Sequence, residues 1–496
     1  YSTFNLSHER KFSGNMGCLI PILVMDTIPG DTFNVRTAQM LRFAPMIAPM
    51  MHQVSVYTHF FFVPNRIIWD NWEQFITLGD DGQQTCVIPY VTQEADDVQP
   101  GSLADYLGLP MTSSGSKDVQ ILPLLAYNRI YNEYYRDQNL ITEIPDVGID
   151  GDNSGTALAD LLWAPPQKRA WQHDYFTSAL PWTQKGPEAT IPLGTTAPVM
   201  YDDAGGLATF VKDNAGALKL NMIAGTTRTD AGGQLQYEEN GPVTSYNIDN
   251  SDLLSVDLSS ATAATINDLR TAFRLQEWLE KNARGGTRYI EAIMSHFGVR
   301  SSDARLQRPE FLGGGSAPVS VSEVLQTGST DATTPQGNMA GHGISVGQDG
   351  SFTYRCEEHG YIIGIMSVMP KTAYQDGIPK HFLKFDVFDY YWPAFAHLGE
   401  QEVETCEVFF DHGLAPEVFG YVPRYAEYKY MNDSVHGQYR TTLDFWHMGR
   451  KFSSAPTLSQ EFIECDPTTR IFAVEEGSPE QLYIHVHHAI RAKQIG

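Results

Sequence analysis

The sequence predicts an all-β protein, a Greek-key sandwich of short strands joined by long connections. The 496 residues include 42 glycines and 28 prolines, which divide the chain into short apolar runs. Those runs have strand length, and the uneven connections between them favour a sandwich over a βαβ fold. Hydrophobic residues make up 42% of the chain, enough for a substantial core, so general disorder is excluded.

The predicted strands are apolar segments bounded by glycine or proline. Gly17–Met25 is apolar and precedes a Pro-Gly pair. Gln53–Val63 alternates apolar and polar residues in its first half and closes with an apolar run at 60–63, which is expected to be fully buried and ends before Pro64. Further strands are predicted at Gly360–Val368, Lys384–Phe388, Cys406–Phe410, Tyr439–Phe445 and Leu482–His488.

Three segments have the apolar spacing of helices. Leu124–Asn139 follows Pro123, a favourable first helical residue. Ile266–Asn282 carries apolar residues along one face and stops before two glycines. Thr287–Phe297 has apolar residues at spacings of three and four and is closed by Gly298. We expect these helices to lie within the connections between strands.

The charge is strongly acidic and unevenly distributed. With 34 Lys and Arg against 59 Asp and Glu, the net charge is −25, so any contact with nucleic acid requires a local basic patch. The segment 191–260 has a net charge of −6, whereas 270–308 has +4. This contrast indicates either two surfaces that face different environments or two solvated faces whose charges differ by chance.

Cysteine usage and hydropathy argue against three further classes of protein: zinc-binding, disulfide-rich and membrane-spanning. Five cysteines, odd in number and without a C-x-x-C pair, argue against structural zinc and a disulfide framework. We expect buried free thiols in a chain folded in a reducing cytosol. No apolar stretch approaches the ~18 residues that span a bilayer. We therefore expect a soluble chain without membrane insertion.

No motif predicts an enzyme. Gly343–Gly347 matches G-x-S-x-G, but a glycine-rich loop is expected there instead of the strand-turn-helix that would activate Ser345. His485 and His487 lie on one face of a predicted strand, a start for a metal site that lacks a third ligand. Glu357–His359 is interpreted as a polar turn. The sequence predicts no catalytic residue, no metal and no cofactor.

Aromatic residues are concentrated in segments that look like loops. Neighbouring prolines stiffen several of these segments. Two interpretations stay open: the loops pack on their own core, or they form subunit contacts, where Tyr and Trp are enriched. The segments are Asp389–Pro393, Phe419–Tyr425, Tyr428–Tyr430 and Leu443–His447.

Long sequence blocks, in order along nearly the whole chain, resemble the microvirus major capsid proteins. The resemblance is to the gokushovirus branch, small bacteriophages with single-stranded DNA. It fades in 191–260 and in 328–338. The blocks are Asn5–His8, Lys11–Gly17, Asp26–Phe33, Thr58–Arg66 with Trp69 and Trp72, Arg136–Leu140, Arg274–Glu280, Arg284–Ile290, Ser295–Arg300, Glu357–Gly364, Phe419–Tyr421, Tyr425–Tyr430 and Phe462–Asp466.

The resemblance implies a single eight-stranded jelly-roll barrel with long inter-strand loops that contain a few helices. It implies a structural subunit that self-assembles into a T=1 icosahedral capsid around circular single-stranded DNA. The protein would be located in the virion and assembled in the cytoplasm of a bacterial host. Implied partners are other copies of the chain, the packaged DNA, a small basic DNA-binding virion protein, a minor capsid or pilot protein and a host-surface receptor.

Two sets of contact residues are expected. For subunit interfaces the candidates are Tyr391, Trp392, Tyr425, Tyr428 and Tyr430. For DNA the candidates are the clustered arginines Arg284, Arg288, Arg300, Arg305 and Arg308. Alternatively, several of these arginines pair with acidic neighbours, namely Glu277, Glu280, Glu291 or Asp303, or with a neighbouring subunit.

We expect residues 1–190 and 261–496 to form the barrel with its insertions, and 191–260 to form a variable surface insertion. Seventy residues exceed an ordinary connection. The resemblance implies a protrusion at a three-fold axis that contacts the host; the alternative is a loop lying flat on the shell. Its apolar candidates are Leu207, Phe210, Val211, Leu218, Leu220 and Met222.

Two other functions share the predicted fold class. A jelly-roll carbohydrate-binding or carbohydrate-active protein requires a cleft with aromatic platforms and paired carboxylates. A metal-dependent cupin-like enzyme requires metal at His485 and His487.

Overall fold

The computed structural model describes residues 2–79, 85–187, 189, 266–328, 330, 336–348, 350–410, 417–473 and 480–494, together with the backbone of short strands between 199 and 256. The chain divides into two compact units. The first comprises residues 1–185 and 280–496, and the second comprises 186–279.

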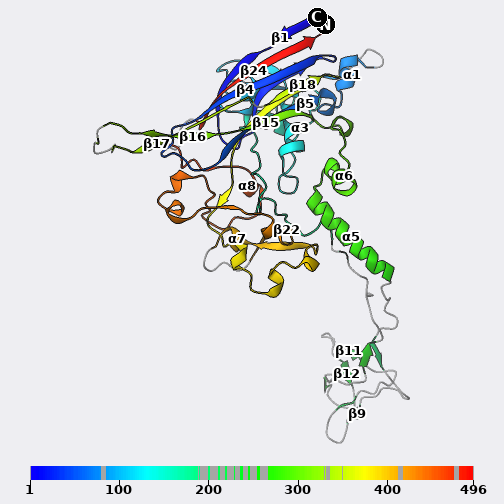
Figure 1. Cartoon of the computed structure of the whole chain (residues 1–496). Coiled ribbons are helices and arrows are strands. Elements are labelled where there is room, and N and C mark those ends of the chain that lie inside the picture. The colour runs from blue at the N-terminus through cyan, green and yellow to red at the C-terminus, as the bar shows by residue number, and fades with distance from the viewer. Residues whose placement is uncertain are drawn as a thin grey trace. The chain divides into compact units, whose positions relative to one another are not determined.

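The first unit is built on two antiparallel sheets (Figure 1). The seven-stranded sheet contains β1 (Ser2–Asn5), β2 (His8–Gly14), β4 (Thr32–Phe43), β16 (Ser320–Leu325), β17 (Met339–Gly347), β18 (Ser351–Arg355) and β24 (Leu482–Gln494). The four-stranded sheet contains β3 (Ile20–Thr27), β5 (Val54–Pro64), β15 (Glu310–Pro318) and β19 (Gly360–Pro370).

Strand order mixes segments that are far apart in the sequence. In the seven-stranded sheet, β24 lies between β4 and the N-terminal strands β1 and β2. The other edge of β4 pairs with β17 along one part of its length and with β18 along another. β17 also pairs with β16. In the four-stranded sheet the order is β15-β5-β19-β3. Every one of these pairings is antiparallel.

The main hydrophobic core lies between the two sheets. Along β4, buried side chains such as Phe33 and Val35 alternate with exposed ones, because successive residues of a strand point to opposite faces. They share one cluster with Phe60 and Phe62 of β5. β19 is buried at every position, which shows that the four-stranded sheet is covered on both faces.

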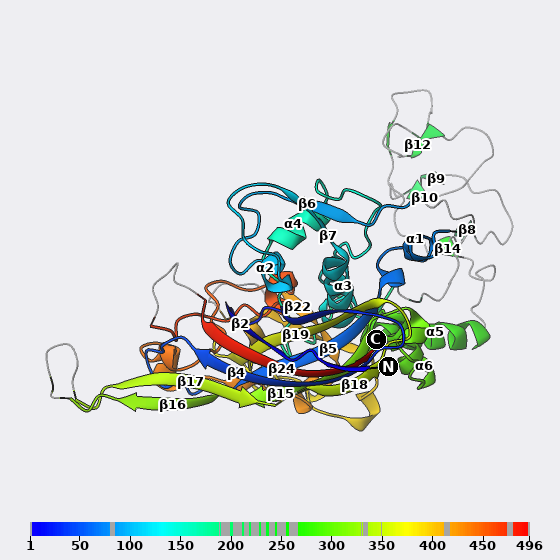
Figure 2. The ribbon, with the colours of Figure 1, turned by 90° about the horizontal axis from the view of Figure 1, so that it is seen from above.

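Helices cover the far face of the four-stranded sheet. α2 (Leu103–Leu107), α3 (Leu122–Ile130) and α4 (Ala157–Trp163) form a second core with residues of β5 and β19 such as Phe61 and Ile363. Figure 2 shows these helices on one side of the sheets and β4, β17 and β24 on the other. The seven-stranded sheet therefore buries one face and exposes the other.

The remaining elements lie mainly in the connections. The helices are α1 (Trp72–Thr77), a π-helix at Tyr131–Tyr135, α5 (Ile266–Gly285), α6 (Tyr289–Phe297), α7 (Thr405–Val408) and α8 (Gln460–Ile463). Short strands are β6 (Tyr90–Gln93), β7 (Lys117–Gln120), β20 (Ala373–Tyr374), β21 (Glu400–Glu404), β22 (Val418–Pro423) and β23 (Asp433–Ser434). The second unit holds β8 (Val199–Tyr201), β9 (Val211–Lys212), β10 (Leu218–Lys219), β11 (Arg228–Thr229), β12 (Leu235–Tyr237), β13 (Thr244–Ser245) and β14 (Leu254–Val256).

The structure confirms the all-β class and four of the seven predicted strands, which correspond to β3, β5, β19 and β24. Three predicted strands are wrong. Lys384–Phe388 leads into a 3-10 helix, Cys406–Phe410 overlaps α7, and Tyr439–Phe445 lies in two 3-10 turns. These segments are short, and local turns capped by side chains or stabilised by aromatic packing replace sheet pairing.

The three predicted helices are confirmed, with shifted boundaries. The first becomes α3 and the π-helix that continues it, and the other two are α5 and α6. All three lie in the connection between β5 and β15, as expected. All five cysteines are free thiols, of which Cys356 and Cys465 are buried and the other three half-buried. Within the described residues, no helix has the length and apolar character needed to cross a bilayer.

Candidate subunit interface

Two neighbouring loops of the first unit expose an unusual number of large side chains. The first loop follows β20 and the second follows β22. We call the exposed residues the aromatic patch: Phe382, Phe385, Phe388, Tyr390, Tyr391, Trp392, Tyr428, Tyr430 and Met431. Phe385 is 89% exposed and Met431 is 97% exposed. Four half-exposed rings already expose roughly 300–500 Å², which is as large as the largest apolar patch of a typical monomer.

Hydrogen bonds fix the first loop in shape. The carboxylate of Asp389 accepts bonds from the backbone N–H groups of Phe385 and Asp386, at 2.9 and 2.8 Å. These bonds hold the pKa of Asp389 below its usual range. The indole Nε1 of Trp392 donates to the carbonyl of Val387 at 2.9 Å. The exposed rings are thus carried on an ordered turn.

Lys384 joins the two loops. Its ammonium lies 2.9 Å from Oε1 of Glu427 and 4.0 Å from the centre of the Tyr428 ring. Its side chain is 5% exposed although the surrounding rings are open to solvent. A buried, paired cation of this kind fixes the relative position of the loops and so presents their aromatic side chains as one surface.

Tyr425 supports the patch from beneath. It is 3% exposed, and its ring centre lies 5.0 Å from that of Tyr391 and 6.3 Å from that of Tyr428. Its backbone has a φ of 61°, a left-handed conformation that is uncommon for a non-glycine residue. Below it lies a third core that includes Val422 and Ala426. Tyr425 therefore belongs to the support of the surface.

Four of the five interface candidates are exposed within the aromatic patch, namely Tyr391, Trp392, Tyr428 and Tyr430. Whether they contact another subunit stays a prediction. Sequence reasoning missed Phe382, Phe385, Phe388 and Met431. The sequence signal that could have identified this loop was the pair Asp386 and Asp389. Acidic residues three apart next to an apolar run are typical of a capped turn, which would present the neighbouring apolar side chains at the surface.

A further exposed apolar surface lies on and beside α6. Tyr289, Met294, Phe297 and Val299 are all more than half exposed. The helix is amphipathic, and these side chains have no cover within the described part of the chain. This surface is a second place at which another protein could bind.

The five arginine candidates for DNA contact fall into two groups. Three of them are paired within the chain. Arg284 lies 3.1 Å from Glu400, Arg288 lies 3.4 Å from Glu291, and Arg308 is buried at 3.6 Å from Asp303. By contrast, Arg300 and Arg305 are exposed. Contact with DNA stays a prediction for all five, and the pairing of three of them matches the alternative interpretation.

The candidates for a three-fold protrusion are mostly beyond the described part of the structure. Leu207, Phe210, Leu220 and Met222 lie outside the described residues. Val211 belongs to the two-residue strand β9, and Leu218 belongs to its antiparallel partner β10. The insertion at 191–260 and its protrusion stay predictions.

The side chains of the motifs considered for catalysis or metal binding form hydrogen bonds and ion pairs with other residues of the chain. The expected loop at Gly343–Gly347 is wrong: the segment lies in β17, and Ser345 is buried with its hydroxyl donating to the carbonyl of Pro318 at 3.0 Å. His485 lies 3.2 Å from Glu9, and Glu358 forms a two-point ion pair with Arg66. Among the described residues no three His, Cys, Asp or Glu side chains are grouped as metal ligands.

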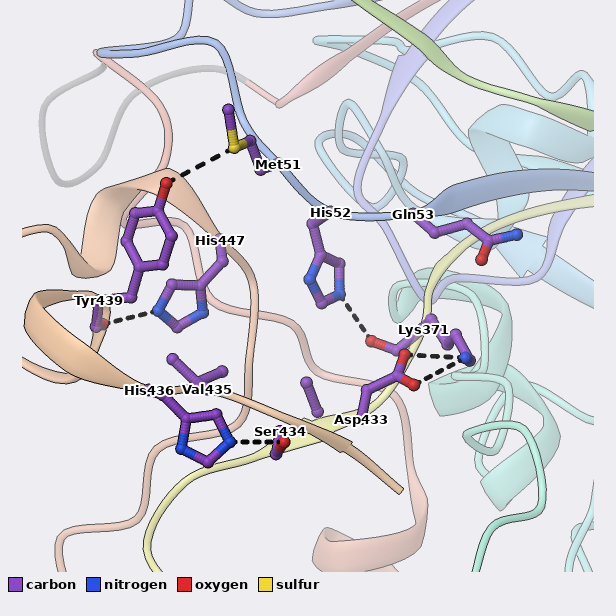
Figure 3. Close-up of a pocket in the computed structure, with 11 residues that line it drawn as sticks. Met51, His52, Gln53, Lys371, Asp433, Ser434, Val435, His436, Tyr439 and His447 are labelled. Atoms are coloured by element: carbon purple, nitrogen blue, oxygen red, sulfur yellow. Dashed lines mark hydrogen bonds and ion pairs between the residues drawn. The ribbon is translucent and has the colours of Figure 1, made fainter. Parts of the chain in front are cut away.

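A pocket of about 290 Å³ is lined by residues from 51–53, 371–373, 433–439 and by His447, and includes parts of β20 and β23 (Figure 3). Its polar groups are already bonded to one another: His52 contacts the carbonyl of Lys371 at 2.7 Å, and the ammonium of Lys371 lies 2.8 Å from Asp433. Burial lowers the pKa of His52 and of His447. With Asp433 as its single carboxylate, the pocket lacks the carboxylate pair of a glycosidase.

A large exposed apolar surface such as the aromatic patch marks a site where a protein associates with another protein, and most oligomers are built from copies of one chain. The family model described as capsid protein (F protein) matches residues 1–494, and the chain belongs to this family. The resemblance to microvirus major capsid proteins is thereby confirmed. The chain is a structural capsid protein of a phage virion.

Curated relatives lead to the same family. The chain is 35% identical to capsid protein VP1 of Chlamydia phage 1, across 96% of this chain and 91% of that protein. It is 37% identical to capsid protein VP1 of Bdellovibrio phage phiMH2K, across 93% and 87%. It is 33% identical to capsid protein VP1 of Spiroplasma virus 4, across 94% and 88%.

Proposed function

We propose that this chain is the major subunit of a closed T=1 icosahedral shell that encloses a circular single-stranded DNA genome. Membership of the capsid family supports a shell, and the aromatic patch supports self-association through extensive contacts. The observation that carries the proposal is that the patch is both exposed and held in one shape. A pre-ordered aromatic surface loses little entropy when another subunit covers it.

We further propose that the two sheets form one eight-stranded jelly-roll barrel. If β17 and β18 count as one strand along β4, the eight are β2, β3, β4, β5, β15, β17/β18, β19 and β24. In chain order, one sheet then holds strands 1, 8, 3 and 6, and the other holds 2, 7, 4 and 5. Two interleaved Greek keys give this order, which supports the barrel.

The other partners follow from the same proposal. Because the chain has a net charge of −25, a small basic virion protein condenses the DNA. A minor capsid or pilot protein completes the particle. The acidic insertion 191–260 forms the three-fold protrusion and contacts a host-surface receptor, which its length and polar composition support.

Electron microscopy of the chain expressed with its virion partners tests the proposal. We expect closed particles of uniform diameter with T=1 symmetry, and single-stranded DNA on extraction. A monomer that remains dispersed under every assembly condition would contradict the shell. Binding or cleavage on a panel of glycans, without particles, would support the carbohydrate-specific alternative.

A further inference from the structure

The exposed face of the seven-stranded sheet is basic, although the protein as a whole is acidic. We call this surface the basic sheet face. Side chains directly opposite in an antiparallel pair share a face, so the register identifies its members. It carries six lysines and arginines and a single carboxylate, Glu9. The cations are Lys11, Arg36, Arg42, Arg355, Arg491 and Lys493.

The register distributes these cations along the whole sheet. On the face, Arg42 of β4 lies opposite Tyr483 of β24, and Lys493 of β24 lies opposite Thr32 at the other end of β4. Ten residues separate the two ends, which corresponds to about 33 Å. The cations therefore form a track that is long enough for several consecutive phosphates.

Aromatic rings lie among the cations. Tyr483 is exposed beside Arg42, and His485 and His487 follow it at two-residue spacing on the same face. Cations that follow a backbone, interleaved with rings on which bases stack, are the combination that binds single-stranded nucleic acid without sequence preference. A purely solvated sheet face does not require this arrangement.

The arginines of this face differ from three of the five arginine candidates in the 270–308 segment, although one lysine of the face, Lys11, is itself paired with Glu9 at 3.0 Å. Among the described residues, no carboxylate lies within ion-pair distance of Arg36, Arg42, Arg355 or Arg491. Arg284, Arg288 and Arg308 are each neutralised by a carboxylate of the same chain. Cations that are already paired in the subunit are poor ligands for phosphate, because binding must first break the internal pair.

We infer that the basic sheet face binds the phosphate backbone of the packaged single-stranded DNA. The inference rests on the proposed function and adds to it the surface that faces the genome. Charge complementarity favours DNA as the partner of this face, because the DNA inside the proposed shell is a polyanion. An acidic surface of a second copy is the competing occupant, and the experiment below separates the two.

The experiment compares three full-length variants that remove exposed cations. The first is R36Q/R42Q/R491Q on the basic sheet face. The second is R300Q/R305Q, the exposed pair of the alternative segment. The third, a control, is K117Q/K451Q, which removes two exposed cations outside both of these surfaces. Thermal unfolding midpoints verify that each variant folds.

Two readouts are taken for each variant. Fluorescence anisotropy with labelled oligothymidylate gives the slope of log affinity against log salt between about 50 and 200 mM. For R36Q/R42Q/R491Q we expect the magnitude of that slope to fall by about 2, since each lost contact to single-stranded DNA contributes about 0.7. The amount of DNA per particle, measured by absorbance, should also fall in R36Q/R42Q/R491Q. Y483A should weaken oligothymidylate binding about tenfold through lost stacking.

The other outcomes overturn the inference. An unchanged slope in R36Q/R42Q/R491Q, or a loss confined to R300Q/R305Q, assigns DNA to another surface. Normal oligothymidylate binding together with failure to form empty shells assigns the face to a second subunit. If the wild-type chain forms no particles, the shell proposal fails, and the oligothymidylate slope still decides whether this face binds single-stranded DNA.

Discussion

The guanidinium Nε of Arg284 lies 3.1 Å from Oε1 of Glu400, whose side chain is completely buried. Burial raises the pKa of Glu400 to about 7, although Arg284 opposes that shift. Glu400 begins β21, the strand that pairs with β22 beneath the aromatic patch. This ion pair links the end of α5 to the support of the candidate interface.

The first prediction concerns Glu400 and pH. Its pKa in the folded chain lies above the value of about 4.3 in an unfolded chain, so its stabilising contribution is complete below about pH 4.3 and is lost as pH rises to 7. Relative to wild type, E400Q should therefore gain stability over this range, by roughly 1–3 kcal/mol. Urea unfolding between pH 4 and 8 measures the difference.

The control for this experiment is E402Q, which replaces an exposed glutamate on the same strand. The difference in unfolding free energy between E402Q and wild type should not change between pH 4 and 8. A flat difference for E400Q as well would show that the pKa of Glu400 is the same in the folded and unfolded chains, and so would contradict the shift attributed to burial.

The second prediction concerns acid and His488. Its imidazole is buried between the sheets, with Nδ1 at 2.9 Å from the hydroxyl of Thr37 and Nε2 at 2.9 Å from the carbonyl of Ile22. Burial lowers its pKa to about 4. Because the unfolded value is about 6.5, stability that is present above pH 6.5 is lost as pH falls to 4, by about 3 kcal/mol.

Unfolding free energies of wild type and H488Q test this. The wild type should lose its advantage over H488Q between pH 6.5 and 4, whereas H487Q, which changes the exposed neighbour, should follow the wild type. An advantage that persists at pH 4 would mean that His488 accepts a proton without cost.

The third prediction concerns the aromatic patch. F385A and Y391A should each impair assembly, at a cost of roughly 2 kcal/mol or more per contact if the rings are central to an interface. Phe385 is almost fully exposed, so its loss should leave the monomer intact. M111A removes an exposed apolar side chain elsewhere and is the matched control. Sedimentation velocity of assembly reactions gives the particle fraction; normal particles from both patch variants would place the interface elsewhere.

The fourth prediction concerns the insertion. Replacement of Thr195–Ser255 by a short Gly/Ser linker should leave particle formation intact, because the strands of the two sheets lie outside this segment. Particles should lack a surface feature in image reconstructions and attach poorly to host cells. If the monomer fails to fold, the segment belongs to the core; if attachment is normal, the receptor contact lies elsewhere.

Periodicity predicted β3, β5, β19 and β24 but missed other strands of the two sheets, including the central strand β4. β4 has clear alternation, from Phe33 and Val35 to Leu41 and Phe43, yet its exposed face carries arginines that resemble a polar connection. β15 and β17 are rich in glycine and look like loops. Their glycines allow close packing: a Cβ at Gly341 would lie 2.4 Å from the carbonyl oxygen of Ala48.

The candidate surfaces were predictable only in part. Aromatic density indicated the loops of the candidate interface. Spacing alone does not distinguish buried Tyr425 from exposed Tyr428, because the burial of each ring depends on how the loops fold around Lys384. The basic sheet face was missed altogether. Its cations are hundreds of residues apart in the chain, and the register of β4 with β24 and β18 brings them together.

The most direct test of the central claim is electron microscopy of the wild-type chain after expression with its virion partners, with icosahedral reconstruction of any particles. We expect closed T=1 shells in which the loops around Tyr391 and Trp392 are covered by a neighbouring subunit. Dispersed monomers, or closed shells in which these loops remain open to solvent, would contradict it.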